Sequence, residues 1–243
     1  MYTKKLGVIG GLGPMATAYF YELLIKMTDA VRDQEHIEMI IFSKPSIPDR
    51  TDYILGRSRE NPVEPMIEAG KALVLLGADY LAMPCITAHY FHDMLTKGIG
   101  APIIHIVRET ADYLKEQGIS RAGIMATDGT IQSGLFQKEL SACGIEPLIP
   151  AEVCQAFVTD LIYRDIKAGR PAGMDKFRAA SDELKARGAQ VIILGCTELS
   201  LIKRDNELGP GFIDAMEVLA KCCIRLCEAK LKPEYGSLIT QQQ

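Results

Sequence analysis

The sequence predicts an α/β fold made of two pseudo-symmetric domains, each built around a parallel sheet. Short apolar segments of strand character alternate with longer segments of helical periodicity, which is the pattern of βαβ units. The same series then occurs a second time along the chain. Two matching segments also end in a cysteine, each eight residues after the glycine of a Gly-Ala pair: Gly77-Ala-Asp-Tyr-Leu-Ala-Met-Pro-Cys85 and Gly188-Ala-Gln-Val-Ile-Ile-Leu-Gly-Cys196.

The first half is expected to contain four strands with helices between and after them. A strand followed by a glycine turn and a helix opens the series, at Leu6-Gly-Val-Ile-Gly-Gly-Leu-Gly13. The expected strands are Leu6–Ile9, Ile37–Phe42, Tyr80–Met83 and Ile103–Ile104, and the expected helices are Ala16–Ala30, Val63–Leu76, His89–Lys97 and Ile106–Glu116.

The second half matches the first segment by segment. Arg121-Ala-Gly-Ile-Met-Ala-Thr-Asp-Gly129 corresponds to the opening strand and turn. The expected strands are Ala122–Ala126, Ile145–Pro147, Val191–Leu194 and Phe212–Ile213, and the expected helices are Gly134–Cys143, Val153–Ala168, Asp175–Arg187 and a last one from Ala215.

These segments predict two Rossmann-like domains. The last helix is expected to cross back onto the first half, so that residues 1–114 plus 215–243 form one domain and residues 115–214 the other. A chain of 243 residues is long enough for two separate cores. Ligands bind at the carboxyl ends of strands in parallel sheets, so we expect the active site in a cleft between the domains.

Composition excludes several classes of function. The hydrophobic fraction is 48%, the charged fraction 24% and the formal net charge −4. Nucleic-acid binding needs a clustered basic surface, which this balance does not favour. No apolar run approaches the length of a membrane span, and the start of the chain lacks the features of a secretory signal. We expect a cytoplasmic enzyme with no membrane or nucleic-acid partner.

The seven cysteines are an odd number with irregular spacing, which argues against a disulfide framework. Cys222, Cys223 and Cys227 fall in a helical stretch, where free cysteine usually behaves as a small buried hydrophobe. Cys143 and Cys154 have no setting that would lower a thiol pKa and are interpreted in the same way. Cys85 and Cys196 differ, because each is expected at a strand end.

The glycine turn allows a second interpretation. Gly11-Leu-Gly-Pro-Met-Ala16 fits the dinucleotide pattern G-x-G-x-x-G/A, so a dinucleotide-binding module is an alternative. Two features argue against it: Pro14 removes a backbone donor, and no acidic residue follows the second strand to bind a ribose. We expect the turn to line the cleft without holding a dinucleotide.

Two further constellations involve Cys85. Cys85, His89 and His92 have a spacing that would place them on one helix face, as a zinc site requires. Cys85 lies at a strand end, however, and no fourth ligand is apparent, so no metal is expected and the histidines are interpreted as packed or capping residues. A Cys-His hydrolase is also possible, but it would leave the twin cysteine without a role.

Several separate motifs resemble the PLP-independent aspartate/glutamate racemase superfamily, closest to its aspartate racemase branch. The resemblance runs from about Leu6 to Leu219. The motifs are Gly10-Gly-Leu-Gly-Pro-Met-Ala-Thr17, Pro48-Asp-Arg-Thr51, Pro84-Cys-Ile-Thr-Ala-His89, Ala126-Thr-Asp-Gly-Thr130, Ile162-Tyr-Arg-Asp-Ile-Lys-Ala-Gly169 and Gly195-Cys-Thr-Glu198.

The resemblance implies a cofactor-independent racemase of aspartate or glutamate that forms a homodimer. Cys85 and Cys196 would be the acid/base pair, because racemisation removes a proton from one face of the α-carbon and returns one to the other. Arg50 and Lys167 would hold the side-chain carboxylate of the substrate. The further substrate-binding residues that we expect are Gly11, Met15, Ile86, Thr87, Thr127, Thr130 and Thr197.

One residue departs from the family pattern. The family usually has asparagine after the first cysteine, whereas this chain has Ile86. An amide that helps to position the amino acid is thus replaced by an aliphatic side chain. Related superfamily members isomerise maleate, racemise hydantoins or decarboxylate malonates, so a cysteine-dependent isomerase or decarboxylase of a small dicarboxylate is the alternative that this residue leaves open.

Overall fold

The computed structural model describes residues 4–241, and its contacts divide the chain into two compact units. The first unit runs to Ile106 and also includes Met216–Ser237. The second unit is Val107–Ala215 with the C-terminal segment from Leu238. Each unit has its own hydrophobic core and its own parallel sheet, as predicted.

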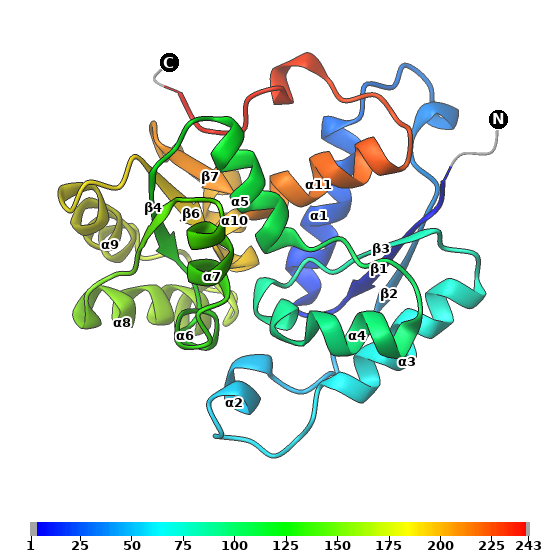
Figure 1. Cartoon of the computed structure of the whole chain (residues 1–243), viewed down its shortest axis with the longest axis horizontal. Coiled ribbons are helices and arrows are strands. Elements are labelled where there is room, and N and C mark those ends of the chain that lie inside the picture. The colour runs from blue at the N-terminus through cyan, green and yellow to red at the C-terminus, as the bar shows by residue number, and fades with distance from the viewer. Residues whose placement is uncertain (1–3, 242–243) are drawn as a thin grey trace. The chain divides into compact units, whose positions relative to one another are not determined.

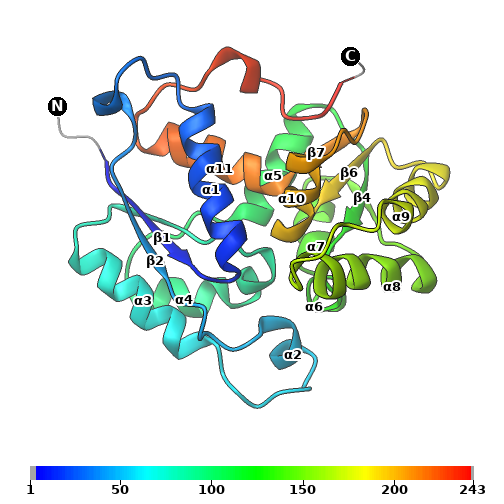
Figure 2. The same cartoon turned by 180° about the vertical axis from the view of Figure 1, so that it is seen from behind.

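The sheet of the first unit has the strand order β2-β1-β3, and both pairings are parallel. The central strand is fully buried, which fits its apolar sequence and the helices on both faces. Figures 1 and 2 show α1 on one side of this sheet and α3 and α4 on the other. The strands are β1 (Leu6–Gly10), β2 (Met39–Ser43) and β3 (Tyr80–Ala82).

The helices of the first unit include one that returns from the far end of the sequence. The segment after α11 pairs with the end of α1, because Asp29 N donates to Lys230 O at 2.8 Å and Lys232 N donates to Met27 O at 2.9 Å. The helices are α1 (Pro14–Met27), η1 (Asp33–Glu35), α2 (Arg50–Ile54), α3 (Val63–Leu75), η2 (Ile86–Phe91), α4 (His92–Ile99), α11 (Ala215–Leu226) and η4 (Pro233–Tyr235).

The sheet of the second unit has the strand order β5-β4-β6-β7, again parallel throughout. Helix α9 packs on β4 and β6, and α8 packs against α9. The strands are β4 (Arg121–Met125), β5 (Glu146–Leu148), β6 (Val191–Leu194) and β7 (Phe212–Asp214). The helices are α5 (Ile106–Glu116), α6 (Asp128–Gln132), α7 (Leu135–Ala142), α8 (Glu152–Asp160), the π-helix η3 (Leu161–Ile166), α9 (Met174–Ala186) and α10 (Thr197–Asp205).

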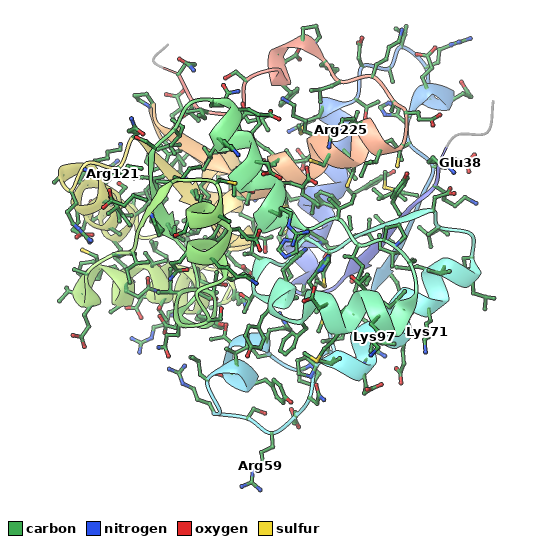
Figure 3. All side chains as sticks on the ribbon, in the orientation of Figure 1. Glu38, Arg59, Lys71, Lys97, Arg121 and Arg225 are labelled. Carbon is green, nitrogen blue, oxygen red and sulfur yellow. The ribbon has the colours of Figure 1, made fainter. Side chains whose placement is uncertain are left out.

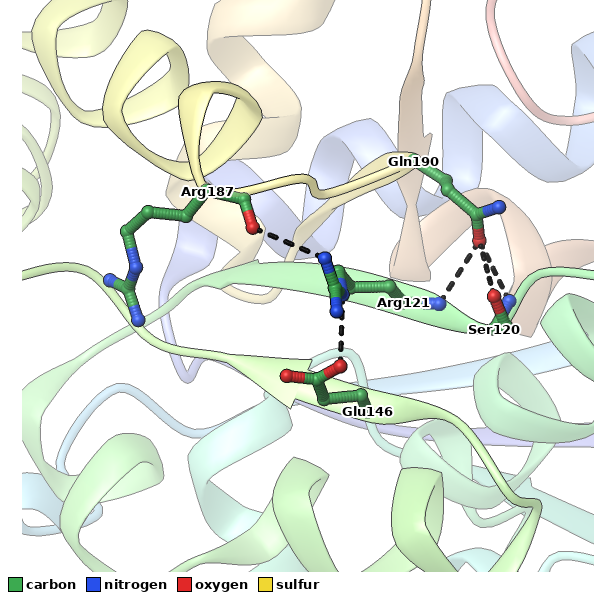
Figure 4. Close-up of polar contacts among 5 residues, drawn as sticks. All are labelled: Ser120, Arg121, Glu146, Arg187 and Gln190. Atoms are coloured by element: carbon green, nitrogen blue, oxygen red, sulfur yellow. Dashed lines mark hydrogen bonds and ion pairs between the residues drawn. The ribbon is translucent and has the colours of Figure 1, made fainter.

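Polar contacts fasten the amino ends of the strands in the second unit (Figure 4). Gln190 Oε1 accepts from Ser120 N at 2.8 Å and from Arg121 N at 3.0 Å. Arg121 Nε donates to Glu146 at 2.9 Å and so joins β4 to β5. These residues lie at the edge opposite the carboxyl ends, so they align the strands without entering the candidate site.

The two sheets repeat one arrangement, as the sequence predicted. β2, β1 and β3 correspond to β5, β4 and β6 in order. A bridge between Leu81 and Ile103 occupies the position that β7 has in the second sheet. Leu81 N donates to Pro102 O at 2.9 Å, and Ile192 N donates to Gly211 O at 2.8 Å in the equivalent place. The expected strand at Ile103–Ile104 is thus only this bridge.

The division between the units differs from the boundary expected after residue 114. Helix α5 contacts the second unit through its own side chains: Tyr113 Oη accepts from Leu238 N at 2.8 Å, and Arg108 pairs with Glu139 at 3.4 Å. The same hydrogen bond to Tyr113 brings the C-terminal segment into the second unit. Neither contact has a signature in the local sequence pattern.

Two short helices also differ from the sequence expectation. No helix was predicted at Arg50, but this residue begins α2, where the Asp49 side chain caps the helix by accepting from Asp52 N at 3.0 Å. Thr127 caps α6 in the same way by accepting from Thr130 N at 3.2 Å. Helices of one turn bury too little surface to produce a periodic apolar pattern, which is why the sequence did not reveal them.

The glycine turn after β1 depends on the absence of a side chain at Gly11. Gly11 has φ of +87°, and a Cβ there would lie 2.5 Å from the backbone nitrogen of Lys44. Gly56 has a similar φ of +69° but has nothing within 4 Å of a Cβ. Substitution of Gly56 therefore adds backbone strain alone, whereas substitution of Gly11 adds backbone strain and a steric overlap.

We expect Gly56→Ala to cost about 1 kcal/mol, from the left-handed backbone alone. Gly11→Ala should cost about 1–3 kcal/mol more, because the added methyl group forces the Lys44 backbone to move. The measurement is the free energy of unfolding in urea. Equal losses in the two variants would contradict the close approach at Gly11.

Candidate active site

The first candidate nucleophile, Cys85, lies just beyond the carboxyl end of β3. Its backbone is extended, and its carbonyl accepts from Ala88 N at 3.2 Å as η2 begins. Only 6% of the residue is exposed. The predicted position, at a strand end and directly before a helix, is confirmed.

Arg50 joins the loops that follow β1 and β2. Its Nη1 donates to the carbonyl oxygens of Ile47 and Pro48, at 3.3 and 2.9 Å, and its Nη2 donates to Leu12 O at 3.0 Å. The buried Arg50 thus fixes the glycine turn to the Pro48–Arg50 segment.

An aromatic contact connects Arg50 and Cys85 through their helices. The rings of Tyr53 in α2 and Phe91 in η2 have centroids 5.8 Å apart. Since Arg50 begins α2 and Cys85 precedes η2, this contact fixes the start of one helix relative to the other. The structure therefore brings Arg50, Cys85 and the glycine turn together at the carboxyl edge of the first sheet.

The remaining candidates of the first unit differ in exposure. Thr87 and Ile86 are buried in η2, with Ile86 only 2% exposed. Met15 is 61% exposed near the start of α1. Gly11 uses its N–H internally, donating to Thr17 Oγ1 at 2.9 Å. A turn whose donor is taken in this way is poorly suited to cradle a phosphate, which agrees with the earlier argument against a dinucleotide site.

Three histidines pack together behind Cys85. His89 Nδ1 lies 3.0 Å from Cys85 O, and its Nε2 lies 3.2 Å from Ile104 O. The rings of His92 and His105 have centroids 4.4 Å apart. Burial, and secondarily the neighbouring His105, lower the pKa of His89 from 6.5 to about 3. A neutral His89 thus braces the turn that carries Cys85, which confirms the packed role predicted for it.

The second candidate nucleophile, Cys196, lies just beyond the carboxyl end of β6 and caps α10. Gly195 allows this turn to approach β4: its N donates to Met125 O at 2.8 Å, and a Cβ would lie 3.1 Å from that of Ala126. Cys196 is 6% exposed, the same fraction as Cys85. The two cysteines therefore occupy equivalent positions in their own units.

The thiol of Cys196 has a carboxylate neighbour. Its Sγ donates to Glu198 Oε2 at 2.9 Å, and Thr197 Oγ1 lies 3.3 Å from the same oxygen. Burial, followed by the charge of Glu198, raises the pKa of Cys196 well above its ordinary value. The charge of Lys167 acts in the opposite direction and lowers that pKa. Cys196 is therefore held as a thiol with its proton directed at Glu198.

Lys167 reaches this site from the end of the π-helix η3. Helix η3 packs against α10, which Cys196 caps. The Lys167 ammonium lies 4.4 Å from the centroid of the Tyr163 ring, a cation–π contact that holds the side chain in place. Lys167 and Cys196 are thus brought together, although 29 positions separate them in the sequence.

Thr127 and Thr130 lie at the carboxyl end of β4, the strand beside β6. Their hydroxyl oxygens are 3.1 Å apart, and both residues are buried. Asp128 between them accepts from Gln155 Nε2 and Thr159 Oγ1, both at 2.9 Å. Thr197 is buried at the start of α10. All candidates of the second unit therefore lie near one edge of its sheet.

The sequence did not reveal the contact between Glu198 and the Cys196 thiol. The residue was noted within the motif Gly195-Cys-Thr-Glu198 but was given no role. An acidic residue two positions after a helix-capping cysteine is a usable signal, because the first turn of the helix can direct its carboxylate back toward the cap. The burial that makes the contact effective is decided only by the fold.

The other cysteines divide into two groups. Cys222, Cys223 and Cys227 are buried, as predicted, and burial raises the pKa of Cys227 to about 11. Cys143 and Cys154 are partly exposed, so their interpretation as buried hydrophobes was wrong. Burial and a contact with Asp112 at 3.5 Å raise the pKa of Cys143.

Within residues 4–241, no group of three or more His, Cys, Asp or Glu side chains is arranged to hold a metal ion. Among the described helices, none has both the length and the hydropathy that crossing a membrane requires.

Comparison with known proteins identifies the family. A family model described as Asp/Glu/Hydantoin racemase matches residues 9–223, most of the chain. The chain belongs to the Asp/Glu/Hydantoin racemase family. The predicted resemblance and the predicted enzyme class, an isomerase that acts as a racemase, are thereby confirmed.

Individual relatives of this racemase extend the comparison. The broad specificity amino-acid racemase RacX of Bacillus subtilis (strain 168) is 29% identical over 228 residues, which cover 90% of this chain and 96% of RacX. The structure of Picrophilus torridus aspartate racemase matches with a TM-score of 0.80 and 30% identity, over 96% of this chain and 97% of that one. Francisella tularensis glutamate racemase in complex with D-glutamate matches in fold alone, with 18% identity and a TM-score of 0.66 over 92% of this chain and 81% of that one.

The buried histidine predicts an acid sensitivity of the racemase. The pKa of His89 is about 3 in the folded protein and 6.5 as its ordinary value, so between these values the unfolded chain binds more protons. The contribution of His89 to the free energy of unfolding is therefore fully present above pH 6.5 and is lost as the pH falls toward 3. We expect a loss of about 2 kcal/mol at pH 5, at roughly 1.4 kcal/mol per pKa unit.

His89→Asn should flatten this dependence, because its amide can donate to Cys85 O but does not titrate. The measurement is the free energy of unfolding in urea from pH 5 to pH 7.5. His36→Asn, in a partly exposed histidine of the same unit, is the matched control and should keep the slope. An unchanged slope in His89→Asn would show that other groups produce the acid sensitivity.

Proposed function

We propose that this protein is a cofactor-independent amino-acid racemase in which Cys85 and Cys196 are the acid/base pair. One observation carries the proposal: each unit holds a buried thiol at the same point of the repeated topology, beyond the third strand and at the start of the next helix. Racemisation needs two proton-transferring groups on opposite sides of one α-carbon. A repeated unit with one thiol per copy supplies the two groups.

The environment of Cys196 suggests how the reaction starts. Its raised pKa and its hydrogen bond to Glu198 favour the thiol, so Cys196 is the proton donor in the resting enzyme. Cys85 must then act as the base and take the α-proton as a thiolate. After Cys196 has delivered its proton to the opposite face, the roles are exchanged, and the enzyme is ready for the other enantiomer.

The carbanionic intermediate requires donors aimed at the α-carboxylate. Thr87, Thr127, Thr130 and Thr197 are the hydroxyl groups that we assign to it. The turn at Gly11 and Met15 is assigned to contact with the substrate, but not through the Gly11 N–H, which donates to Thr17. The charges of Arg50 and Lys167 are assigned to a second carboxylate at the far end of the substrate. The carbonyl contacts of Arg50 support this assignment, because they hold the guanidinium at the carboxyl edge of the first sheet.

Ile86 favours a second candidate within the same reaction, a racemase with a wider range of amino acids. An aliphatic side chain cannot donate to a carboxylate or accept from an ammonium group, so it selects less strictly than an amide. The likeness to RacX, which is described as a broad specificity enzyme, supports this candidate. Aspartate and glutamate remain the substrates that we propose first, because Arg50 and Lys167 are present.

A panel of D- and L-amino acids in deuterated water tests the proposal. The α-proton of a true substrate should exchange from either enantiomer without added cofactor, as read by proton NMR. Exchange confined to aspartate and glutamate supports the acidic assignment, whereas exchange of neutral amino acids supports the wider range. No exchange with any amino acid would reject a racemase of free amino acids.

Cysteine variants test the acid/base pair. Cys85→Ala and Cys196→Ala should each lower the racemisation rate by at least about 10³-fold, because general acid/base groups contribute on this order. Cys154→Ala, in a partly exposed thiol, is the matched control and should retain the wild-type rate. Near-full activity of Cys196→Ala would favour a one-thiol hydrolase or decarboxylase instead.

Glu198→Gln tests the proton-holding contact. Removing the carboxylate charge should lower the pKa of Cys196, since that charge raises it, while the amide oxygen can still accept from the thiol. Lys167→Met should shift the pKa in the opposite direction. The pH dependence of Cys196 alkylation by iodoacetamide, followed by mass spectrometry in a Cys85→Ala background, measures both shifts. Shifts of the same sign would contradict the arrangement.

The homodimer and the cytoplasmic location remain predictions. The first is tested by the mass of the protein in solution and the second by fractionation of the cells that produce it.

A further inference from the structure

Lys167 depends on an irregular element of the fold for its position. It follows directly after the π-helix η3 and serves as its C-terminal cap. Lys167 N donates to Ile162 O at 3.0 Å, a hydrogen bond over five residues of the kind that defines a π-helix. Such turns are rare and often occur at functional sites. The place of the Lys167 ammonium group is therefore set by a turn that contacts from outside it must hold.

Apolar packing does not fix the segment that carries Lys167. Residues 167–170 are exposed, and Gly169 among them has φ of +70°. A segment with few buried apolar contacts opens easily unless polar contacts hold it. The contacts made by this segment and by η3 therefore decide where the lysine lies.

Asp165 supplies such contacts at two points of the loop. Its main-chain carbonyl accepts from Arg170 N at 2.8 Å, and its side-chain Oδ2 accepts from Gly173 N at 3.1 Å. The loop that begins at Lys167 thus closes onto one residue of η3. The side chain of Asp165 is only 15% exposed, so water and salt screen its contacts less than those of a surface carboxylate.

Lys176 of α9 connects Asp165 to the residue before η3. Its Nζ lies 3.4 Å from Asp165 Oδ2 and 3.7 Å from Asp160 Oδ2. Asp160 is the last residue of α8 and also pairs with Arg164 at 3.2 Å. One ammonium group therefore spans η3 from the residue that precedes it to its fifth residue. A network of this kind contributes more than an isolated surface pair.

We propose that Asp165 and Lys176 are positioning residues, which hold η3 in the conformation that keeps Lys167 near Cys196. Helix η3 packs against α10, which Cys196 caps, so a shift of η3 moves the ammonium group relative to the thiol. The inference rests on the proposed function, in which Lys167 binds the far carboxylate of the substrate. Asp165 and Lys176 act only through Lys167.

The charge of Lys167 has a measurable effect on Cys196. It lowers the pKa of this thiol, against burial and the charge of Glu198, which raise it. Arg121, labelled in Figure 3, is a cation of the same unit that cannot replace it: Arg121 begins β4, at the opposite edge of the sheet, and pairs with Glu146 at 2.9 Å. A displaced Lys167 therefore leaves burial and Glu198 without this opposing charge.

The sign of the effect separates positioning from a direct effect of charge. Asp165→Ala removes a negative charge, which by direct interaction lowers the pKa of a nearby thiol. Release of Lys167 removes a positive charge from the surroundings of Cys196 and raises the same pKa. We expect a rise in Asp165→Ala, because the loop that carries Lys167 loses its contact with Gly173 and η3 loses its contact with Lys176.

The measurement is the pH dependence of Cys196 alkylation by iodoacetamide, followed by mass spectrometry in a Cys85→Ala background. Asp165→Ala and Lys176→Met should each move the midpoint to higher pH, in the same direction as Lys167→Met. Neither should add to the shift when it is combined with Lys167→Met, because the group that they position is then absent. A direct effect of the Lys176 charge would persist in that combination.

Asp175→Asn is the matched control for the loss of a carboxylate from α9. The Asp175 side chain is fully exposed and pairs with Arg178 at 3.5 Å, away from the contacts of η3, so the midpoint should not move. Unchanged melting by circular dichroism shows that a variant is folded. If Asp165→Ala does not fold, Lys176→Met, which retains the contact between Asp165 and Gly173, decides the question by the same measurement.

Steady-state kinetics with aspartate, in the chain with Cys85 intact, give a second readout. Asp165→Ala should raise KM by about 5-fold, the scale of an ion-pair network, with a smaller change in kcat, because the far carboxylate loses its cation. A midpoint that falls or stays in place in folded Asp165→Ala, or a shift that adds to that of Lys167→Met, would overturn the positioning role alone. An unchanged midpoint and KM in Lys167→Met would reject the role of Lys167 in the proposed function and the positioning role with it.

Discussion

The parallel pairing of β3 with β1 and of β6 with β4 determines where each thiol lies. Both pairings end at a short turn that carries a buried cysteine and opens into a helix. The turn after β6 can approach β4 only because Gly195 has no side chain. Residues from neighbouring strand ends therefore gather around each thiol. The residues of these loops make the surroundings of the two thiols different.

The two thiols have different surroundings despite their equivalent positions. Beside Cys85, a neutral buried histidine braces the backbone, and Arg50 is bound to backbone carbonyl oxygens at the same edge. Beside Cys196, a carboxylate accepts a hydrogen bond from the thiol and raises its pKa, and an ammonium group acts in the opposite direction. A reaction that needs one acid and one base at the same time is served by this asymmetry, because the surroundings of Cys196 favour its thiol form.

The same sheet that positions Cys85 also exposes an apolar edge. Its carboxyl end carries the loops of the candidate site, whereas the outer side of β2 carries Ile41 and Phe42.

The sequence by itself determined the repeated α/β order, the strand ends at Cys85 and Cys196 and the family, because apolar periodicity and short motifs are local properties of the chain. It did not reveal α2 or α6, whose single turns carry no periodic signal, or the membership of α5 in the second unit, which depends on Tyr113 and Arg108. Only the tertiary structure decided that Glu198 meets the Cys196 thiol and that His89 stays neutral. Both facts depend on burial, which is set by residues distant in the sequence.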